Sequence, residues 1–172
     1  MKIKLFSAPI LREVSTVVTE YDPASLGPLI KDMAKAMYKE EGIGLAANQI
    51  GDKRAVCIMD TSEDRDPNQV KVFINPQITG STAEYVRIEE SCLSIPGVFA
   101  ETERFKEVTV KYNKVDGSEV QEVLKGIEAI AIQHEVDHLN GKLFVDMLGP
   151  VKKNLVISKC KKFLKAKQRG VI

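Results

Sequence analysis

The chain of 172 residues has the size of one domain, and its apolar share of 44% and charged share of 28% are typical of a globular protein. Because 25 basic and 24 acidic residues nearly balance, the composition excludes a protein that coats nucleic acid through general positive charge. Uncharged runs are far shorter than the roughly 20 residues of a bilayer span, and no signal-peptide core is present. With only three cysteines, we expect a cytoplasmic protein without disulfides. Because no run is long enough to span a bilayer, we also expect no membrane partner.

Charge is divided unevenly along the chain. Residues 151–172 contain eight basic residues and no acidic one, which leaves 17 basic and 24 acidic residues, about −7, in residues 1–150. We expect one domain over residues 1–172, made of an acidic body (1–150) and a basic C-terminal helix (151–172).

The first predicted element is a helix over about 25–40, because apolar residues from Leu26 to Met37 recur at spacings of three and four. The small, uncharged residues 42–51 then indicate a tightly packed loop. Their G-x-G-x-x-A spacing does not indicate a dinucleotide site, because it follows a helix and not a strand. Either a plain turn or close approach of a ligand to the backbone explains the glycines, and Gln49 would offer that ligand a neutral amide donor.

Strands are predicted next. Short apolar runs at 54–60 and 70–75 indicate two of them. Alternation of apolar and polar residues from Val108 to Tyr112 indicates a half-buried strand, and the Asp-Gly pair at 116–117 predicts a hairpin turn into a strand over 119–124.

Two helices complete the pattern, one over about 126–140, ended by Gly141, and one from about Pro150 to Lys167. The order of helix, strands, helix and helix predicts an α+β fold rather than repeating βαβ units. We expect antiparallel strands around a central helix, with further helices at the N- and C-terminal ends.

The only two histidines lie on the predicted central helix, in the H-E-x-x-H pattern of His134, Glu135 and His138. Imidazoles one turn apart share a helix face and can bind one metal ion at about 2.0–2.1 Å. Glu135 follows about 100° around the helix and could act on a water at the metal without being a ligand. The alternative is a core helix with two satisfied histidines, which is disfavoured because burying unpartnered imidazoles is costly.

A metal ion requires a third protein ligand. No Glu follows Glu135, and Phe144 stands where a third histidine of a metzincin would be needed, so the remaining candidates are mainly cysteines. Cys57 is typical of core filling in a strand, and Cys160 lies among lysines of a predicted helix. Cys92 lies in a segment that we expect to be irregular, which could direct its thiolate at the helix, although another buried cysteine is the alternative.

Three segments together resemble the motifs of the peptide deformylase family. Residues 42–49 (GIGLAANQ) are similar to its first motif, G-x-G-x-A-A-x-Q. Residues 90–94 (ESCLS) are similar to E-G-C-L-S, and residues 133–141 (QHEVDHLNG) to Q-H-E-x-D-H-L-x-G. All three occur in the family's order and spacing, and the likeness extends over nearly the whole chain.

Two positions depart from the family pattern. Ser91 replaces the usual Gly, whose backbone contacts the substrate in the family, so its Cβ is expected to alter the loop or the peptide groove. Phe99 stands near a position at the groove rim where many relatives carry Arg. Neither departure touches an implied metal ligand.

The resemblance implies a metal-dependent hydrolase that removes the formyl group from the N-terminal formyl-methionine of new peptides and releases formate. The implied metal ligands are Cys92, His134 and His138. Glu135 is implied as general base and then general acid. The Gln49 amide and the backbone N–H of Leu93 are implied as donors to the oxyanion.

The resemblance also implies a substrate site. The methionine pocket would be lined by Ile43, Ile88, Ile127, Ile130 and Ala131, and the backbone near Ile43, Gly44 and Ser91 would pair with the peptide as an added strand. Glu90 is a candidate partner for a metal-bound histidine, fixing its tautomer, and Arg104 could neutralise Glu90.

Cys-His-His ligation suits Zn²⁺ by softness and geometry. The resemblance instead implies Fe²⁺ as the functional cofactor, with Zn²⁺, Ni²⁺ or Co²⁺ able to occupy the site in a purified sample. The basic C-terminal helix is expected either to pack on the body as a solvated helix or to dock on the ribosome, as such a helix does in some family members. We expect no sequence-specific nucleic-acid binding.

Two other functional classes are compatible with the H-E-x-x-H pattern. A zinc endopeptidase using the same H-E-x-x-H is disfavoured by the missing downstream ligand. A non-catalytic metal- or peptide-binding module is disfavoured because Glu135 and Gln49 are both present and neither is needed merely to hold a metal ion.

Overall fold

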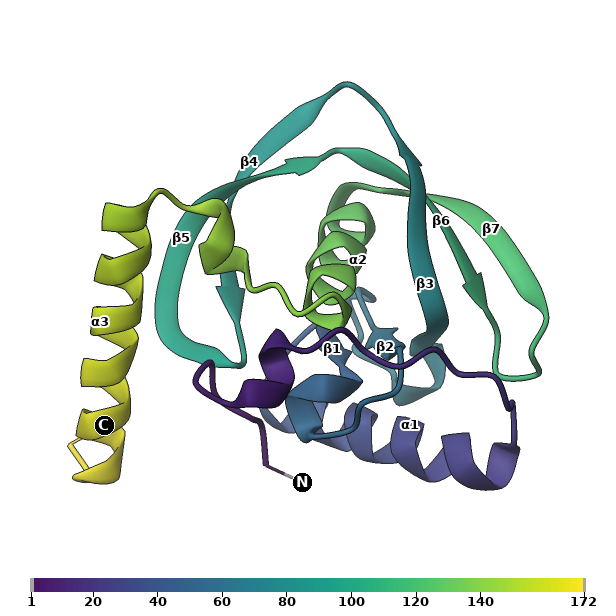
Figure 1. The fold of residues 1–172 in the computed structure, drawn as a ribbon, viewed down its shortest axis with the longest axis horizontal. Coiled ribbons are helices and arrows are strands. Elements are labelled where there is room, and N and C mark those ends of the chain that lie inside the picture. The colour runs from purple at the N-terminus through teal and green to yellow at the C-terminus, as the bar shows by residue number, and fades with distance from the viewer. Residues whose placement is uncertain (1, 172) are drawn as a thin grey trace.

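Helix α2 (Gly126–Leu139) lies at the centre of the molecule, and the strands arch around it (Figure 1). The computed structural model describes residues 2–171. The other α-helices are α1 (Pro23–Lys39) and α3 (Pro150–Gln168), with short 3₁₀ turns at Pro9–Arg12, Ala47–Ile50, Pro67–Gln69 and Phe144–Met147. The strands are β1 (Gly44–Ala46), β2 (Val56–Met59), β3 (Lys71–Ser81), β4 (Tyr85–Cys92), β5 (Ile95–Phe105), β6 (Glu107–Asn113) and β7 (Glu119–Lys125). The expected α+β fold with a central helix is confirmed.

All strand pairs are antiparallel and form two sheets. The larger sheet has the order β1-β2-β3-β6-β7, and β4 pairs with β5 alone over the described residues. The free edge of β4 therefore remains available for another strand. No helix in residues 2–171 is long and apolar enough to cross a membrane.

Strand β2 is buried on both faces, because helices cover both sides of it. Cys57 and Met59 face the core around α2, whereas Val56 and Ile58 face the core around α1. A strand buried on both faces has a continuous apolar sequence instead of an alternating one. This explains why the apolar run at 54–60 predicts the strand although apolar and polar residues do not alternate there.

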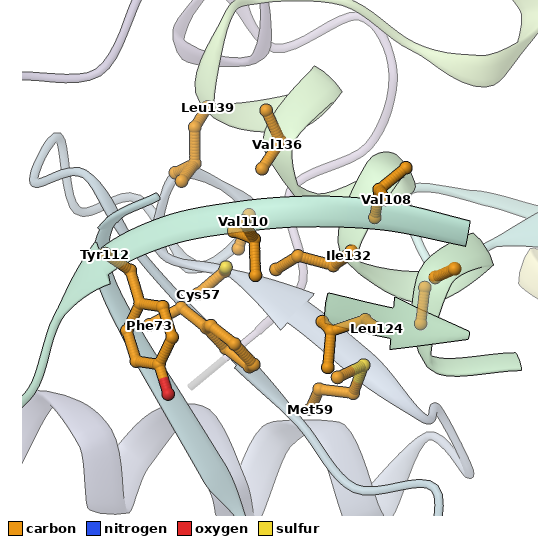
Figure 2. Packing of buried hydrophobic residues seen from close by; sticks show 13 residues of the cluster. Cys57, Met59, Phe73, Val108, Val110, Tyr112, Leu124, Ile132, Val136 and Leu139 are labelled. Carbon is orange, nitrogen blue, oxygen red and sulfur yellow. The ribbon is translucent and has the colours of Figure 1, made fainter. Parts of the chain in front are cut away.

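The core around α2 joins the helix to the inner face of the larger sheet (Figure 2). Ile132, Val136 and Leu139 of α2 lie over Val110 of β6, and the rings of Phe73 and Tyr112 lie 4.6 Å apart. Burying each large apolar side chain contributes roughly 1.5–3 kcal/mol. This packing fixes the helix that carries both histidines.

Helix α3 stands at the edge of the molecule beside β5 (Figure 1). Its buried residues, Val156 and Cys160, join the core that contains Cys92 and Ile95. Gly97 has a φ of +75°, and Phe163 occupies the space that a Cβ there would need. The apolar stripe of α3 thus packs on the hairpin that bears Cys92.

Two local predictions are wrong. Residues 42–51 are not a loop but contain β1 and a 3₁₀ turn, because Gly44 to Ala46 pair with β2. The segment around Cys92 is not irregular but the end of a hairpin, with a bulge between Glu90 and Cys92. The β4–β5 hairpin was not predicted, although alternation of apolar and charged residues over 86–89 carries a strand signal.

Candidate active site

Three donor atoms converge where the end of β4 meets α2. The thiol of Cys92 lies 3.1 Å from Nε2 of His138, and the two histidine Nε2 atoms lie 3.1 Å apart. The ligand atoms of Cys92, His134 and His138 all fall within 4.8 Å of one another. Two nitrogens bound to one tetrahedral metal ion are separated by about 3.3 Å, so this spacing fits a single ion.

A buried carboxylate orients the first histidine. Glu90 contacts Nδ1 of His134 and accepts hydrogen bonds from Thr102 at 2.6 Å and from Arg104 at 2.7 and 3.0 Å. Burial opposes its ionisation, but the bonds from His134 and Arg104 hold the pKa of Glu90 well below its ordinary value. Since an ionised carboxylate accepts the Nδ1 proton, Nε2 of His134 faces the other two ligands and is the atom that would bind a metal ion.

The second histidine is buried and favoured in its neutral form. Burial and the charge of His134 lower the pKa of His138 well below its ordinary value. Asn48 donates a hydrogen bond to the backbone carbonyl of His138 at 2.5 Å, which ties the end of α2 to the turn after β1. A neutral imidazole is the form that binds a metal ion.

The surroundings of His134 also favour positive charge. Its burial lowers the pKa, but Cys92 and Glu90 raise it well above the ordinary value. Cys92 and Glu90 thus create a site in which a positive charge is stabilised. The donor set therefore fits a divalent metal ion by distance, by chemistry and by charge.

Glu135 reaches the same place from the next position of α2. It is 4% exposed, its Oε2 has no hydrogen-bond partner, and burial raises its pKa to about 7. A Cβ at Gly44 would collide with its carboxylate, so this glycine lets β1 approach it closely.

Gln49 lies within reach of the ligands. Its Nε2 donates to Ser94 Oγ at 3.1 Å and lies 3.6 Å from the Cys92 sulfur. Its Oε1 accepts from the backbone N–H of Ala46 at 2.8 Å, so the amide orientation is set by β1.

A cavity of about 440 Å³ opens beside these groups. Its walls include Gln49, Cys92, Leu93, His134 and Glu135. They also include every residue expected at the substrate site: Ile43, Gly44, Ile88, Ser91, Ile127, Ile130 and Ala131. Ile127 is 50% exposed, since this face of α2 forms a cavity wall instead of packing in the core.

Several residues at the site escaped sequence reasoning. Thr102 bonds to Glu90, Asp137 accepts from Arg104 at 2.6 Å, and Ser94 accepts from Gln49. The expected ion pair of Arg104 with Glu90 is present. Asp137 lies inside the third motif and Ser94 inside the second, so both could have been proposed as partners, whereas Thr102 carries no local signal.

Comparison with known proteins identifies the family. The family model described as polypeptide deformylase matches residues 1–154. The chain belongs to this family. It is a hydrolase that removes the formyl group from the N-terminal methionine of new polypeptides.

The relatives and solved structures that are similar to this chain are also peptide deformylases. A peptide deformylase of Rhizobium meliloti (strain 1021) is 43% identical over 163 residues, 94% of this chain and 91% of the relative. One from Pseudomonas aeruginosa is 40% identical over 162 residues, 94% and 95% of the two chains. The crystal structure of a peptide deformylase from Legionella pneumophila has a TM-score of 0.91 at 38% identity, covering 98% of this chain and 97% of that one. Against the family pattern, Ser91 lies exposed in the cavity wall and Phe99 is 65% exposed on β5.

Proposed function

We propose that this chain hydrolyses formyl-methionyl peptides with Cys92, His134 and His138 as metal ligands and Glu135 as the acid–base group. The observation that carries the proposal is the convergence of three ligand atoms beside a buried, unpartnered carboxylate in one apolar-walled cavity. Neither a core helix nor a simple binding module requires that arrangement.

Fe²⁺ is the proposed cofactor, with Zn²⁺, Ni²⁺ or Co²⁺ as ions that the same ligands would accept. Bound there, a divalent ion would polarise the formyl carbonyl and lower the pKa of an attacking water. Glu90, Thr102 and Arg104 support the ligand set by keeping His134 in the tautomer that points Nε2 at the ion.

Glu135 is the proposed proton carrier. Its carboxylate faces the cavity without a hydrogen-bond partner at Oε2, so it can take a proton from the water and deliver it to the departing amine. Gln49 Nε2 and the backbone N–H of Leu93 are the proposed donors to the oxyanion. Removing one such donor typically costs about 10²–10³ in rate.

The peptide is proposed to lie along the free edge of β4. Residues 88–92 of β4 and 42–44 before and within β1 all line the cavity, so we infer that an extended peptide in it pairs with the backbone of both segments. The methionine side chain would then lie against Ile88, Ile127 and Ile130. A formyl carbon carries only hydrogen, so it enters a narrow site that excludes an internal peptide carbonyl.

Formate release tests the proposal. Purified protein given Fe²⁺ without oxygen should release formate from formyl-Met-Ala-Ser and leave casein intact. Cleavage of casein without formate release would indicate an endopeptidase, and metal binding without either activity would indicate a binding module.

Helix α3 is the proposed docking element for the ribosome, which would place the enzyme in the cytoplasm where formylated N-termini emerge. Seven of the eight basic residues in 151–172 are exposed, and Lys153 pairs with Asp146 at 2.6 Å. The family match ends at residue 154, so most of α3 lies beyond it. Basic residues 151–172 against an acidic body over 1–150 would orient the enzyme toward phosphate, and this supports treating them as two functional parts.

A further inference from the structure

The segment between β2 and β3 forms hydrogen bonds with residues 42 and 43, which form one wall of the cavity. Nη2 of Arg65 donates a hydrogen bond to the Gly42 carbonyl at 2.5 Å. Its guanidinium carbon lies 5.2 Å from the centre of the Tyr38 ring. Arg65 is not among the residues that line the cavity, so it contacts the wall without reaching the substrate side.

A buried aspartate supports this contact. Asp60 is 2% exposed and accepts hydrogen bonds from the Tyr38 hydroxyl at 2.6 Å and from Ser62, while Nε of Arg65 lies 3.9 Å from it. The backbone N–H of Asp60 donates to the Ile43 carbonyl at 2.9 Å. Two successive carbonyls of the wall, those of Gly42 and Ile43, are therefore held by the loop.

The backbone is strained at Arg65 and next to its partner Gly42, at Glu41. Only three described residues other than glycine have positive φ, and two of them are Glu41 (56°) and Arg65 (52°). A left-handed conformation is unfavourable for such side chains, so the surrounding contacts must stabilise it. Strain of this kind concentrates where a precise backbone position has a function.

The position of the wall matters because the groups opposite it are close. A Cβ at Gly42 would lie 2.7 Å from Leu93 Cδ1, and one at Gly44 would collide with Glu135. A shift of residues 42–44 by a fraction of an ångström would therefore change how they contact Leu93 and Glu135.

We propose that Arg65 is a positioning residue for the substrate peptide, acting through the Gly42 carbonyl to hold residues 42–44 as a strand edge. The proposal rests on the proposed function, in which the peptide pairs with that edge. Arg65 pre-organises the edge, so that binding does not have to order it. Its loss weakens peptide binding without removing any group that acts on the formyl carbon.

Arg65→Gln in the metal-loaded enzyme tests this role. Because it removes a charge-assisted hydrogen bond, KM for formyl-Met-Ala-Ser should rise about 5- to 10-fold while kcat changes by less than about twofold. KM for formyl-methionine amide, which has no further residue to pair, should rise less. Arg65→Lys, which can still reach one carbonyl, should recover part of the loss, and metal content and Tm should stay unchanged.

Arg54→Gln is the matched control. Arg54 also pairs with an aspartate, Asp52 at 2.7 Å, and donates to a carbonyl, that of Ser25 at 3.3 Å, but Ser25, unlike Gly42, does not line the cavity. An unchanged KM in Arg65→Gln, a fall in kcat alone, or an equal effect of Arg54→Gln would each overturn the proposal.

Calorimetry with unformylated Met-Ala-Ser separates this inference from the proposed reaction. Weaker binding to Arg65→Gln in an enzyme that releases no formate would contradict the reaction and leave the role of Arg65 standing. If the enzyme releases formate and Met-Ala-Ser binds equally well to Arg65→Gln and wild type, the reaction stands and the proposed role of Arg65 is contradicted.

Discussion

Glu135 differs from its neighbours on α2 in having a carboxylate oxygen that is buried without a partner. Glu135→Gln keeps the size of the side chain but cannot accept a proton. We expect metal content to be retained and formate release from formyl-Met-Ala-Ser to fall by about 10² or more, in line with general-base contributions. Near-normal turnover by this variant would assign the proton transfer to another group.

The three cysteines have the same chemistry and different surroundings. Cys92 lies 3.1 Å from His138, whereas Cys57 lies in the core around α2 and Cys160 lies on α3. Cys92→Ala should lose both metal and activity, measured by metal analysis and formate release. Cys57→Ala and Cys160→Ala should keep both, with a stability loss of about 1 kcal/mol from the small cavities left behind. Full metal content in Cys92→Ala would contradict its assignment as a ligand.

Asp146 joins three separate elements. Its carboxylate accepts hydrogen bonds from Arg12 in the N-terminal 3₁₀ turn at 2.5 Å, from Lys153 of α3 at 2.6 Å and from the backbone N–H of Leu143 at 2.8 Å. Partial burial opposes ionisation, but the bonds from Lys153 and Arg12 lower the pKa of Asp146 from 3.8 to about 2. The bonds thus favour the ionised carboxylate, which links α3 to the body.

The pH dependence of stability follows from that shift. Because the folded state depresses the pKa, the contribution of Asp146 is complete above about pH 4 and is lost as pH falls through about 2. Asp146→Asn should lower the free energy of unfolding at pH 7 by about 1 kcal/mol, allowing for solvent screening. The difference between variant and wild type, measured by urea unfolding, should shrink between pH 4 and pH 2. A difference that stays constant over this range would show that the carboxylate charge does not stabilise the link.

At the scale of the whole molecule, the exposed basic face of α3 is the feature most separable from catalysis. Replacing Lys161, Lys162 and Lys165 with Gln leaves the buried Val156 and Cys160 in place, whereas truncation from Lys159 would remove Cys160. Formate release from a short peptide should be unchanged. Co-sedimentation with ribosomes at low salt should weaken, because each lost phosphate contact reduces counterion release. Equal pelleting of variant and wild type would show that α3 only covers β5.

Local physics explains what could be predicted. Helix periodicity placed His134 and His138 one turn apart, and the length of 172 residues implied a single domain. The continuous apolar run of β2 was also readable, since helices on both faces bury all of its residues. The prediction of a loop failed at residues 42–51, because the three-residue strand β1 is stabilised by pairing with β2 and not by local propensity. The β4–β5 hairpin was missed although its strands are 8 and 11 residues long.

The sequence by itself indicated the family, through the resemblance of its three motifs. It also placed the two histidines and the adjacent glutamate together, because spacing on one helix is a property of covalent geometry. Only the tertiary structure decided that the Cys92 thiol reaches those histidines, since the contact joins β4 to α2 across 46 residues. The same holds for Glu90, held by Thr102, Arg104 and His134 from two other elements, and for Arg65 on the back of the cavity wall. Contacts between side chains far apart in the chain depend on how whole elements pack, and no single segment of the sequence determines that packing.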